Sequence, residues 1–209
     1  MSIPFFENLR AGRPQTVVVY GTSLTQGGAW TRAMKSWLEE RFPGLVTFVN
    51  SGGPGENSDW GLANVQEKVV AHQPDLVFIE FSYNDAHTKF EMPLERGAEN
   101  LGKIVAAIRE ARPETGIVLQ TMNVGWDAPG SNPSFSMRPQ LSAFNENYRQ
   151  CSVKLGLRLL DHVVAWQRLK EDDPETFRRF VPDGSHPSEE GSLAVTWPAV
   201  KTFLEEGTG

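Results

Sequence analysis

Five short apolar runs, separated by longer amphipathic stretches, constrain the fold of this chain more than any other feature. Each run has the length of a β-strand, and each interval is long enough to contain a helix. This alternation is typical of β-α units wound into a parallel sheet, so we expect an α/β fold with a five-stranded parallel sheet. The expected strands are residues 16–20, 46–50, 76–81, 116–120 and 157–160.

Helical periodicity supplies the layers that should cover this sheet. Apolar side chains share one face in the stretch 30–41, and the stretch 101–108 repeats the pattern. Further helices are expected at 62–71, 139–154, 163–170 and 188–205, with Pro198 bending or interrupting the last. Because no linker or repeat divides the chain, residues 1–209 are expected to form a single domain.

The composition argues against several classes of partner and cofactor. A formal net charge of -6 and a pI near 5.3 leave no basic face for nucleic acid or an anionic membrane, so a neutral substrate fits better. The histidines are scattered and no carboxylate cluster accompanies them, so no metal site is expected. The single cysteine, Cys151, cannot form an internal disulfide.

The first six residues lack the basic segment and apolar core of a signal peptide. The chain as it stands is therefore expected to be cytoplasmic, or secreted if a signal peptide has been removed. The sequence leaves the oligomeric state open.

Two segments near opposite ends of the chain offer a nucleophile, a base and a carboxylate. Ser23 follows the first strand in a turn that leads into a helix, although the hydroxyl residues of this turn would also serve as helix caps. His186 follows Asp183 by three residues in a loop bounded by glycine and proline, a spacing that lets the carboxylate orient the imidazole toward Ser23. The other histidines, His72, His87 and His162, have no such company and are expected to be structural or exposed.

The next two strands also end in turns that suit catalysis. Glycines in the stretch 50–58 let the backbone approach a ligand closely, and a free N–H there could donate to a developing oxyanion; a plain tight turn is the alternative. Asn84, just after the third strand, could supply a further donor or merely form an Asx turn.

These four segments resemble, in order and in local sequence, the SGNH subfamily of the GDSL-type esterases and lipases. Residues 21–25 are similar to the GDSL-S/T block, 50–55 to N-x-G-x-x-G, 82–85 to G-x-N-D and 183–187 to D-x-x-H-P. Thr22 replaces the usual aspartate of the first block, and Ser82 replaces the usual glycine of the third.

The resemblance implies a flavodoxin-like three-layer α/β/α sandwich and a serine esterase without a cofactor. It implies a triad of Ser23, His186 and Asp183, with an acyl-enzyme intermediate. It also implies an oxyanion hole formed by the backbone amides of Ser23 and Gly55 and by the side chain of Asn84.

The substrate is expected to meet the long loops 83–93 and 122–139. Aromatic side chains near these loops suit stacking on sugar rings, which favours deacetylation of a carbohydrate and an oligosaccharide or small-molecule ester as substrate. The candidate contacts are Trp60, Trp126 and Tyr83, whereas Trp30 and Trp37 are more typical of core residues.

Other readings of the sequence stay open. A broader carboxylesterase, thioesterase or lysophospholipase is the main alternative, and an FMN-binding flavodoxin-like protein is a remote one. The sequence does not decide whether Asp85, Glu80 and Arg138 contact substrate or brace loops.

Overall fold

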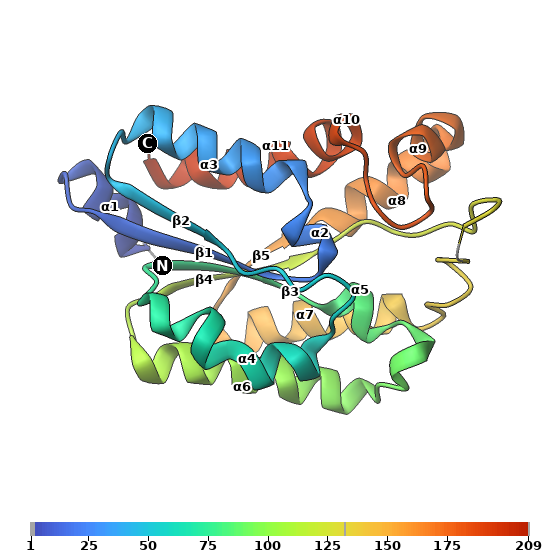
Figure 1. The fold of residues 1–209 in the computed structure, drawn as a ribbon, viewed down its shortest axis with the longest axis horizontal. Coiled ribbons are helices and arrows are strands. Elements are labelled where there is room, and N and C mark those ends of the chain that lie inside the picture. Colours follow the sequence, from blue (N-terminus) through green and yellow to red (C-terminus); the bar gives the residue numbers. More distant parts are fainter. Residues whose placement is uncertain (1–2, 132, 209) are drawn as a thin grey trace.

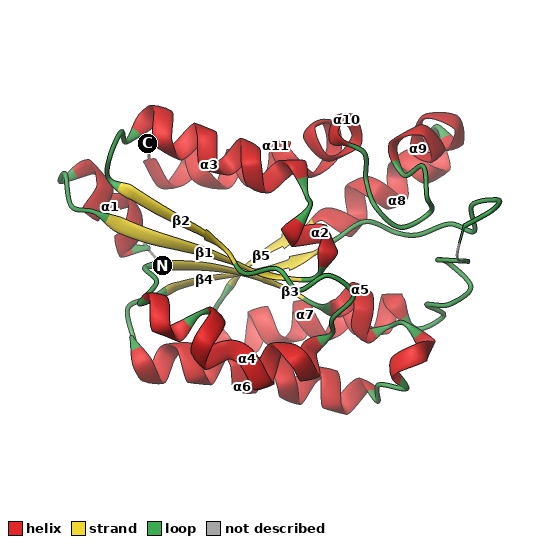
Figure 2. Cartoon of the chain, in the orientation of Figure 1, coloured by secondary structure: helices red, strands yellow, loops and turns green. Residues whose placement is uncertain are grey.

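Five parallel strands form the centre of the molecule in the computed structural model, which describes residues 3–131 and 133–208. Their order across the sheet is β2-β1-β3-β4-β5, and every neighbouring pair is parallel (Figure 1, Figure 2). The expected five-stranded parallel sheet is therefore confirmed. The strands are β1 (Gln15–Gly21), β2 (Val46–Asn50), β3 (Leu76–Glu80), β4 (Gly116–Thr121) and β5 (Arg158–Asp161).

Helices cover both faces of the sheet, which confirms the three-layer architecture. Figure 1 shows α1, α3 and α11 on one face and α4, α6 and α7 on the other. The first set is α1 (Pro4–Arg10), α3 (Ala29–Arg41) and α11 (Trp197–Thr208). The second set is α4 (Ser58–Lys68), α6 (Leu94–Ala111) and α7 (Leu141–Leu155).

The strands read as continuous apolar runs because both of their faces are buried. In β1, Val17 and Val19 belong to the core beneath α3 and α11, whereas Val18 and Tyr20 belong to the core beneath α4 and α6. Alternation along a strand thus fills two separate cores from one run of residues.

Shorter helices gather around the carboxyl ends of the strands. Two of them start almost directly after β1 and β3, so their side chains lie at this edge of the sheet: α2 (Ser23–Gln26) and α5 (Ser82–Asp85). The others are α8 (His162–Asp172), α9 (Pro174–Phe180), α10 (Glu189–Gly191) and a single 3-10 turn, Thr88–Phe90. A second 3-10 turn, Val70–His72, precedes β3 at the opposite edge of the sheet. Parallel sheets build their binding sites at the edge formed by the carboxyl ends of their strands.

The structure departs from the sequence expectations mainly at helix ends. Helix α4 begins at Ser58 because the side-chain oxygen of Asn57, Oδ1, accepts from the backbone N–H groups of Asp59 and Trp60. The expected break at Pro198 takes the form of a π-helical turn over Ser192–Thr196 that leads into α11. A wider turn suits this position because the proline nitrogen cannot donate a hydrogen bond.

Candidate active site

The structure brings together three side chains that are far apart in the sequence. Ser23 is the first residue of α2, and its Oγ lies 2.9 Å from Nε2 of His186. The other ring nitrogen of His186, Nδ1, lies 2.7 Å from Oδ2 of Asp183. The side chains of His186 and Asp183 are both about half exposed to solvent, at 51% and 48%.

A tight turn fixes the relation between Asp183 and His186. The second carboxylate oxygen of Asp183, Oδ1, accepts from the backbone N–H groups of Ser185 at 2.8 Å and His186 at 2.7 Å. Gly184 has a φ of +83°, and a Cβ there would overlap the carbonyl oxygen of Trp126. Glycine is therefore required for the turn that presents both side chains together.

These contacts set the protonation of the pair. Partial burial raises the pKa of Asp183, but the N–H donors of His186 and Ser185 outweigh it and hold that pKa below its ordinary value. Because an ionised Asp183 accepts from Nδ1–H, the lone pair of Nε2 faces the hydroxyl of Ser23. The arrangement can thus remove the proton of the serine.

The backbone amide of Ser23 is available to a ligand. Within residues 22–27, which are all described, the N–H groups of residue 22 and of residues 24–27 have acceptors inside the protein. The structure gives no acceptor for the N–H of Ser23 in this turn. As the first residue of α2, Ser23 also has no partner for this group within the helix.

The two other expected oxyanion donors come from the ends of the neighbouring strands. Gly55 lies in the turn after β2 with a φ of +77°. The same turn is joined to the end of β1, because the N–H of Gly53 donates to the Gly21 carbonyl at 2.7 Å. Asn84, in α5 after β3, uses Nδ2 to donate to the Glu56 carbonyl at 2.7 Å, and the second hydrogen of that amide remains for another acceptor.

The GDSL-like lipase/acylhydrolase family model matches residues 19–194, a span that contains this whole arrangement. The chain belongs to this family. It is therefore a carboxylic ester hydrolase of the GDSL type. Family membership also favours hydrolysis over the flavin-binding alternative.

Relatives of known sequence or structure agree with the family. An arylesterase of Vibrio mimicus is 25% identical over 182 residues, which cover 84% of this chain and 82% of that protein. A catalytic mutant of an acetylxylan esterase from Geobacillus stearothermophilus has a TM-score of 0.73 at 20% identity, over 92% of this chain and 95% of the other. A two-domain esterase active on acetylated mannans has a TM-score of 0.75 at 21% identity, over 97% of this chain and 51% of the other. The likeness to both structures is one of fold.

The three residues whose roles the sequence left open, Glu80, Asp85 and Arg138, form hydrogen bonds to turns and helices of this GDSL hydrolase. Glu80 is fully buried and bonds to the turn that carries Ser23. Asp85 is 2% exposed and accepts from the Ser58 N–H at 2.8 Å, at the start of α4. Arg138 donates to the Tyr83 carbonyl at 2.8 Å. Burial raises the pKa of Glu80 and the pKa of Asp85, each to about 7.

Two of the three expected substrate contacts lie where they brace loops. Tyr83 is only 2% exposed, because its hydroxyl is bonded to Ser134 Oγ at 2.7 Å and the Arg138 guanidinium lies 4.0 Å from its ring centre. This burial leaves little of Tyr83 open to a ligand, and its contact with substrate stays a prediction. Trp126 is half-buried, and its indole N–H donates to the Val181 carbonyl at 2.7 Å.

Trp60 is more open than Tyr83 and lies at the edge of a surface hollow. It is half-buried and lines a hollow of about 420 Å³ beside the turn that contains Gly53. Trp30 is 1% exposed within the core, as expected. Trp60 thus shares a surface hollow with the glycine-rich turn after β2.

The sequence did not predict the side chains that form hydrogen bonds to Ser185, the residue before His186. Asn123 Nδ2 donates to the Ser185 carbonyl at 2.8 Å, and Ser185 Oγ donates to Ser134 Oγ at 2.7 Å. Asn123 and Ser134 lie in the loop 122–139, whose length was the only signal of a role. The contacts of a long loop depend on its backbone conformation, which local sequence patterns do not predict.

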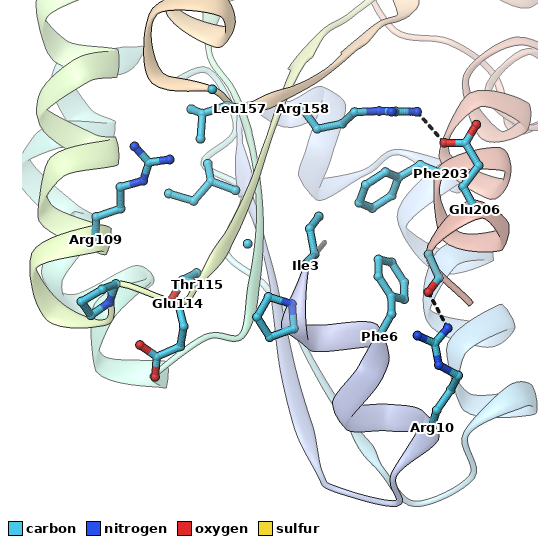
Figure 3. A pocket seen from close by; sticks show the side chains of 16 residues that line it. Ile3, Phe6, Arg10, Arg109, Glu114, Thr115, Leu157, Arg158, Phe203 and Glu206 are labelled. Atoms are coloured by element: carbon cyan, nitrogen blue, oxygen red, sulfur yellow. Dashed lines mark hydrogen bonds and ion pairs between the residues drawn. The ribbon is translucent and has the colours of Figure 1, made fainter. Parts of the chain in front are cut away.

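Neither of the two largest of the described cavities is lined by a triad residue. One of about 720 Å³ opens at the amino ends of β4 and β5, where Figure 3 shows Ile3, Phe6, Arg109 and Phe203 around it. The other, of about 710 Å³, lies between the loop 122–139 and helices α7 and α8. Ser23 and His186 line neither cavity.

Over residues 3–131 and 133–208, no three His, Cys, Asp or Glu side chains are grouped as a metal would require. Over the same residues, no helix has both the length and the apolar character needed to cross a bilayer.

Proposed function

We propose that this GDSL hydrolase removes small acyl groups, specifically acetyl, from a carbohydrate through an acyl-enzyme formed on Ser23. One observation carries the proposal: the side chains of His186 and Asp183 are half exposed beside the half-buried Ser23. An open site admits a bulky alcohol such as a sugar chain. The large cavities that could enclose a long acyl chain are lined by neither Ser23 nor His186.

The reaction begins with the serine. As Ser23 Oγ attacks the acyl carbonyl carbon, Nε2 of His186 takes the hydroxyl proton, and the ionised Asp183 stabilises the imidazolium that results. The negative charge on the carbonyl oxygen is held by the N–H groups of Ser23 and Gly55 and by the Asn84 amide. The imidazolium then protonates the departing sugar oxygen, which leaves the acyl group on Ser23.

Deacylation repeats these steps with water. His186 Nε2 takes a proton from the water as its oxygen attacks the acyl-serine, and the proton is then returned to Ser23 Oγ. Acetate and the free serine are the products.

Support for a carbohydrate comes from the fold neighbours and from Trp60. Two structures of the same fold are named as esterases of acetylated xylan and acetylated mannans. The half-buried Trp60 lines a hollow beside the glycine-rich turn, and an aromatic ring at such a place suits stacking on a sugar ring.

A broader carboxylesterase is the second candidate. The arylesterase relative favours it, and the cavity of about 710 Å³ has apolar side chains such as Phe135 and Val163 in its lining. That cavity would matter for catalysis if an aryl or long acyl group could reach it from Ser23.

Acyl preference separates the two candidates. We expect kcat/KM for p-nitrophenyl acetate to exceed that for the octanoate by at least about tenfold, because Ser23 lines neither of the two largest described cavities. We also expect acetate release from acetylated xylo-oligosaccharides. Preference for the octanoate, with no release from the oligosaccharides, would contradict the proposed substrate class while leaving the esterase activity intact.

A further inference from the structure

A buried carboxylate that the proposed mechanism does not use lies beneath the nucleophile turn. Glu80 is the last residue of β3 and is 0% exposed. Its Oε1 lies 2.6 Å from the Thr22 backbone nitrogen, 2.9 Å from Thr22 Oγ1 and 2.7 Å from Thr25 Oγ1. All three donors belong to the turn that carries Ser23.

These bonds extend to both sides of the serine. Thr22 Oγ1 accepts from the Leu24 N–H at 3.1 Å, so its own hydrogen is free to be donated to Glu80. The amides before and after Ser23 are thus tied to Glu80, one directly and one through a single hydroxyl. The Ser23 N–H between them has no acceptor in this turn.

Backbone pairing fixes where this carboxylate lies. Glu80 is paired with Gly21 in the parallel register of β1 and β3. A Cβ at residue 21 would overlap both the Glu80 side chain and the Thr25 hydroxyl. The glycine of the first family block therefore leaves the space in which the carboxylate meets the turn.

We propose that Glu80 is a positioning residue, which acts through Thr22 and Thr25 to hold the N–H and Oγ of Ser23 in their reacting positions. The inference rests on the proposed role of Ser23 as nucleophile. It also accounts for Thr22 in place of the usual aspartate, because a hydroxyl can donate to Glu80 and an ionised carboxylate cannot.

Replacing the acceptor should reduce turnover more than substrate affinity. In Glu80→Leu we expect kcat for p-nitrophenyl acetate to fall by about 30-fold to 1000-fold, the range for a lost oxyanion donor, with KM within about threefold. Affinity for a boronic acid that forms a tetrahedral adduct on the serine should fall in parallel. Glu80→Gln retains an acceptor oxygen and should recover most of this kcat.

Asp75 offers a matched control at the other end of the same two strands. Its Oδ2 accepts from the Thr16 N–H at 2.7 Å, and the residue is 8% exposed. Asp75→Leu should lower the melting temperature, yet the folded protein should keep kcat within about twofold, because no part of the nucleophile turn depends on it.

Three results would overturn the inference. One is a folded Glu80→Leu variant with the kcat of the unaltered protein, and another is a loss of kcat no greater than in Asp75→Leu. If Glu80→Leu does not fold, Thr25→Val removes one of the bonds to Glu80 without changing side-chain shape, and it should lower kcat about threefold to tenfold. An unchanged kcat in Thr25→Val is the third result that would overturn the inference. Failure of the nucleophile itself is separate, since it would appear as activity in Ser23→Ala.

Discussion

At the scale of single residues, catalysis by this chain depends on which hydrogen-bond donors are left without internal acceptors. Among the residues that the structure describes, no acceptor is found for the N–H of Ser23 or for one hydrogen of the Asn84 amide. Most buried donors in a folded protein are paired inside it. Free donors gathered next to an activated hydroxyl are the groups that can stabilise an oxyanion.

Removal of the Asn84 amide tests this reasoning. Asn84→Ala should lower kcat by about 10² to 10³ with a smaller change in KM, because the lost bond forms mainly in the transition state. Asn147 is a suitable control, since its Nδ2 also donates to a backbone carbonyl, that of Leu94 at 2.9 Å, away from the site. If Asn147→Ala loses as much activity, the effect belongs to packing and not to the oxyanion.

The buried acids make a prediction about pH. Burial raises the pKa of Asp85 from 3.8 to about 7, so the folded protein binds a proton there that the unfolded chain releases. The stabilisation from this group is complete below pH 3.8 and is lost as pH rises through 7. At about 1.4 kcal/mol per pH unit, the contribution is on the order of 4 kcal/mol.

Urea unfolding of the unaltered protein and of Asp85→Asn at pH 5 and pH 8 measures this contribution. Between pH 5 and pH 8, the unaltered protein should lose a few kcal/mol of unfolding free energy relative to Asp85→Asn. Equal pH dependence in both proteins would show that Asp85 does not titrate in this range.

At the scale of elements, apolar runs predicted the strands well because burial on both faces leaves little room for polar residues. The helices were harder, since their ends depend on caps such as Asn57 and on tertiary contacts. Helices α1 and α9 escaped prediction, and both are short segments of seven residues whose Phe5, Leu9 and Phe177 pack into cores assembled from distant parts of the chain.

The turn Asp183–His186 is the element on which the site depends most closely. Gly184→Ala places a Cβ against the Trp126 carbonyl in a backbone conformation that L-residues rarely adopt. We expect His186 to be displaced and kcat to fall by about 10²-fold. Gly12→Ala is the matched control, because its φ of +72° imposes similar strain where nothing lies within 4 Å.

Comparison of the two variants separates strain from placement. Both should be destabilised by about 1 kcal/mol or more in thermal unfolding, and Gly12→Ala should keep its kcat. A Gly184→Ala variant that stays fully active would mean that the turn tolerates the change and does not fix His186.

At the scale of the whole molecule, the parallel sheet gathers the site at one edge. Three neighbouring strands, β2, β1 and β3, end in the turns of Gly55, Ser23 and Asn84, and the chain returns after α9 to add His186. The four sequence blocks predicted which residues take part, because each carries a local turn signature. They could not predict the braces from Asn123, Trp126 and Ser134, which depend on the path of the loop 122–139.

Steady-state hydrolysis of p-nitrophenyl acetate by Ser23→Ala, compared with the unaltered protein at equal folded concentration, shows whether Ser23 is the nucleophile. We expect kcat to fall by roughly 10⁴ or more, because the hydroxyl, imidazole and carboxylate act as a unit. Circular dichroism should show the variant fully folded. Retention of the original kcat by the folded variant would contradict the assignment of Ser23 as the nucleophile.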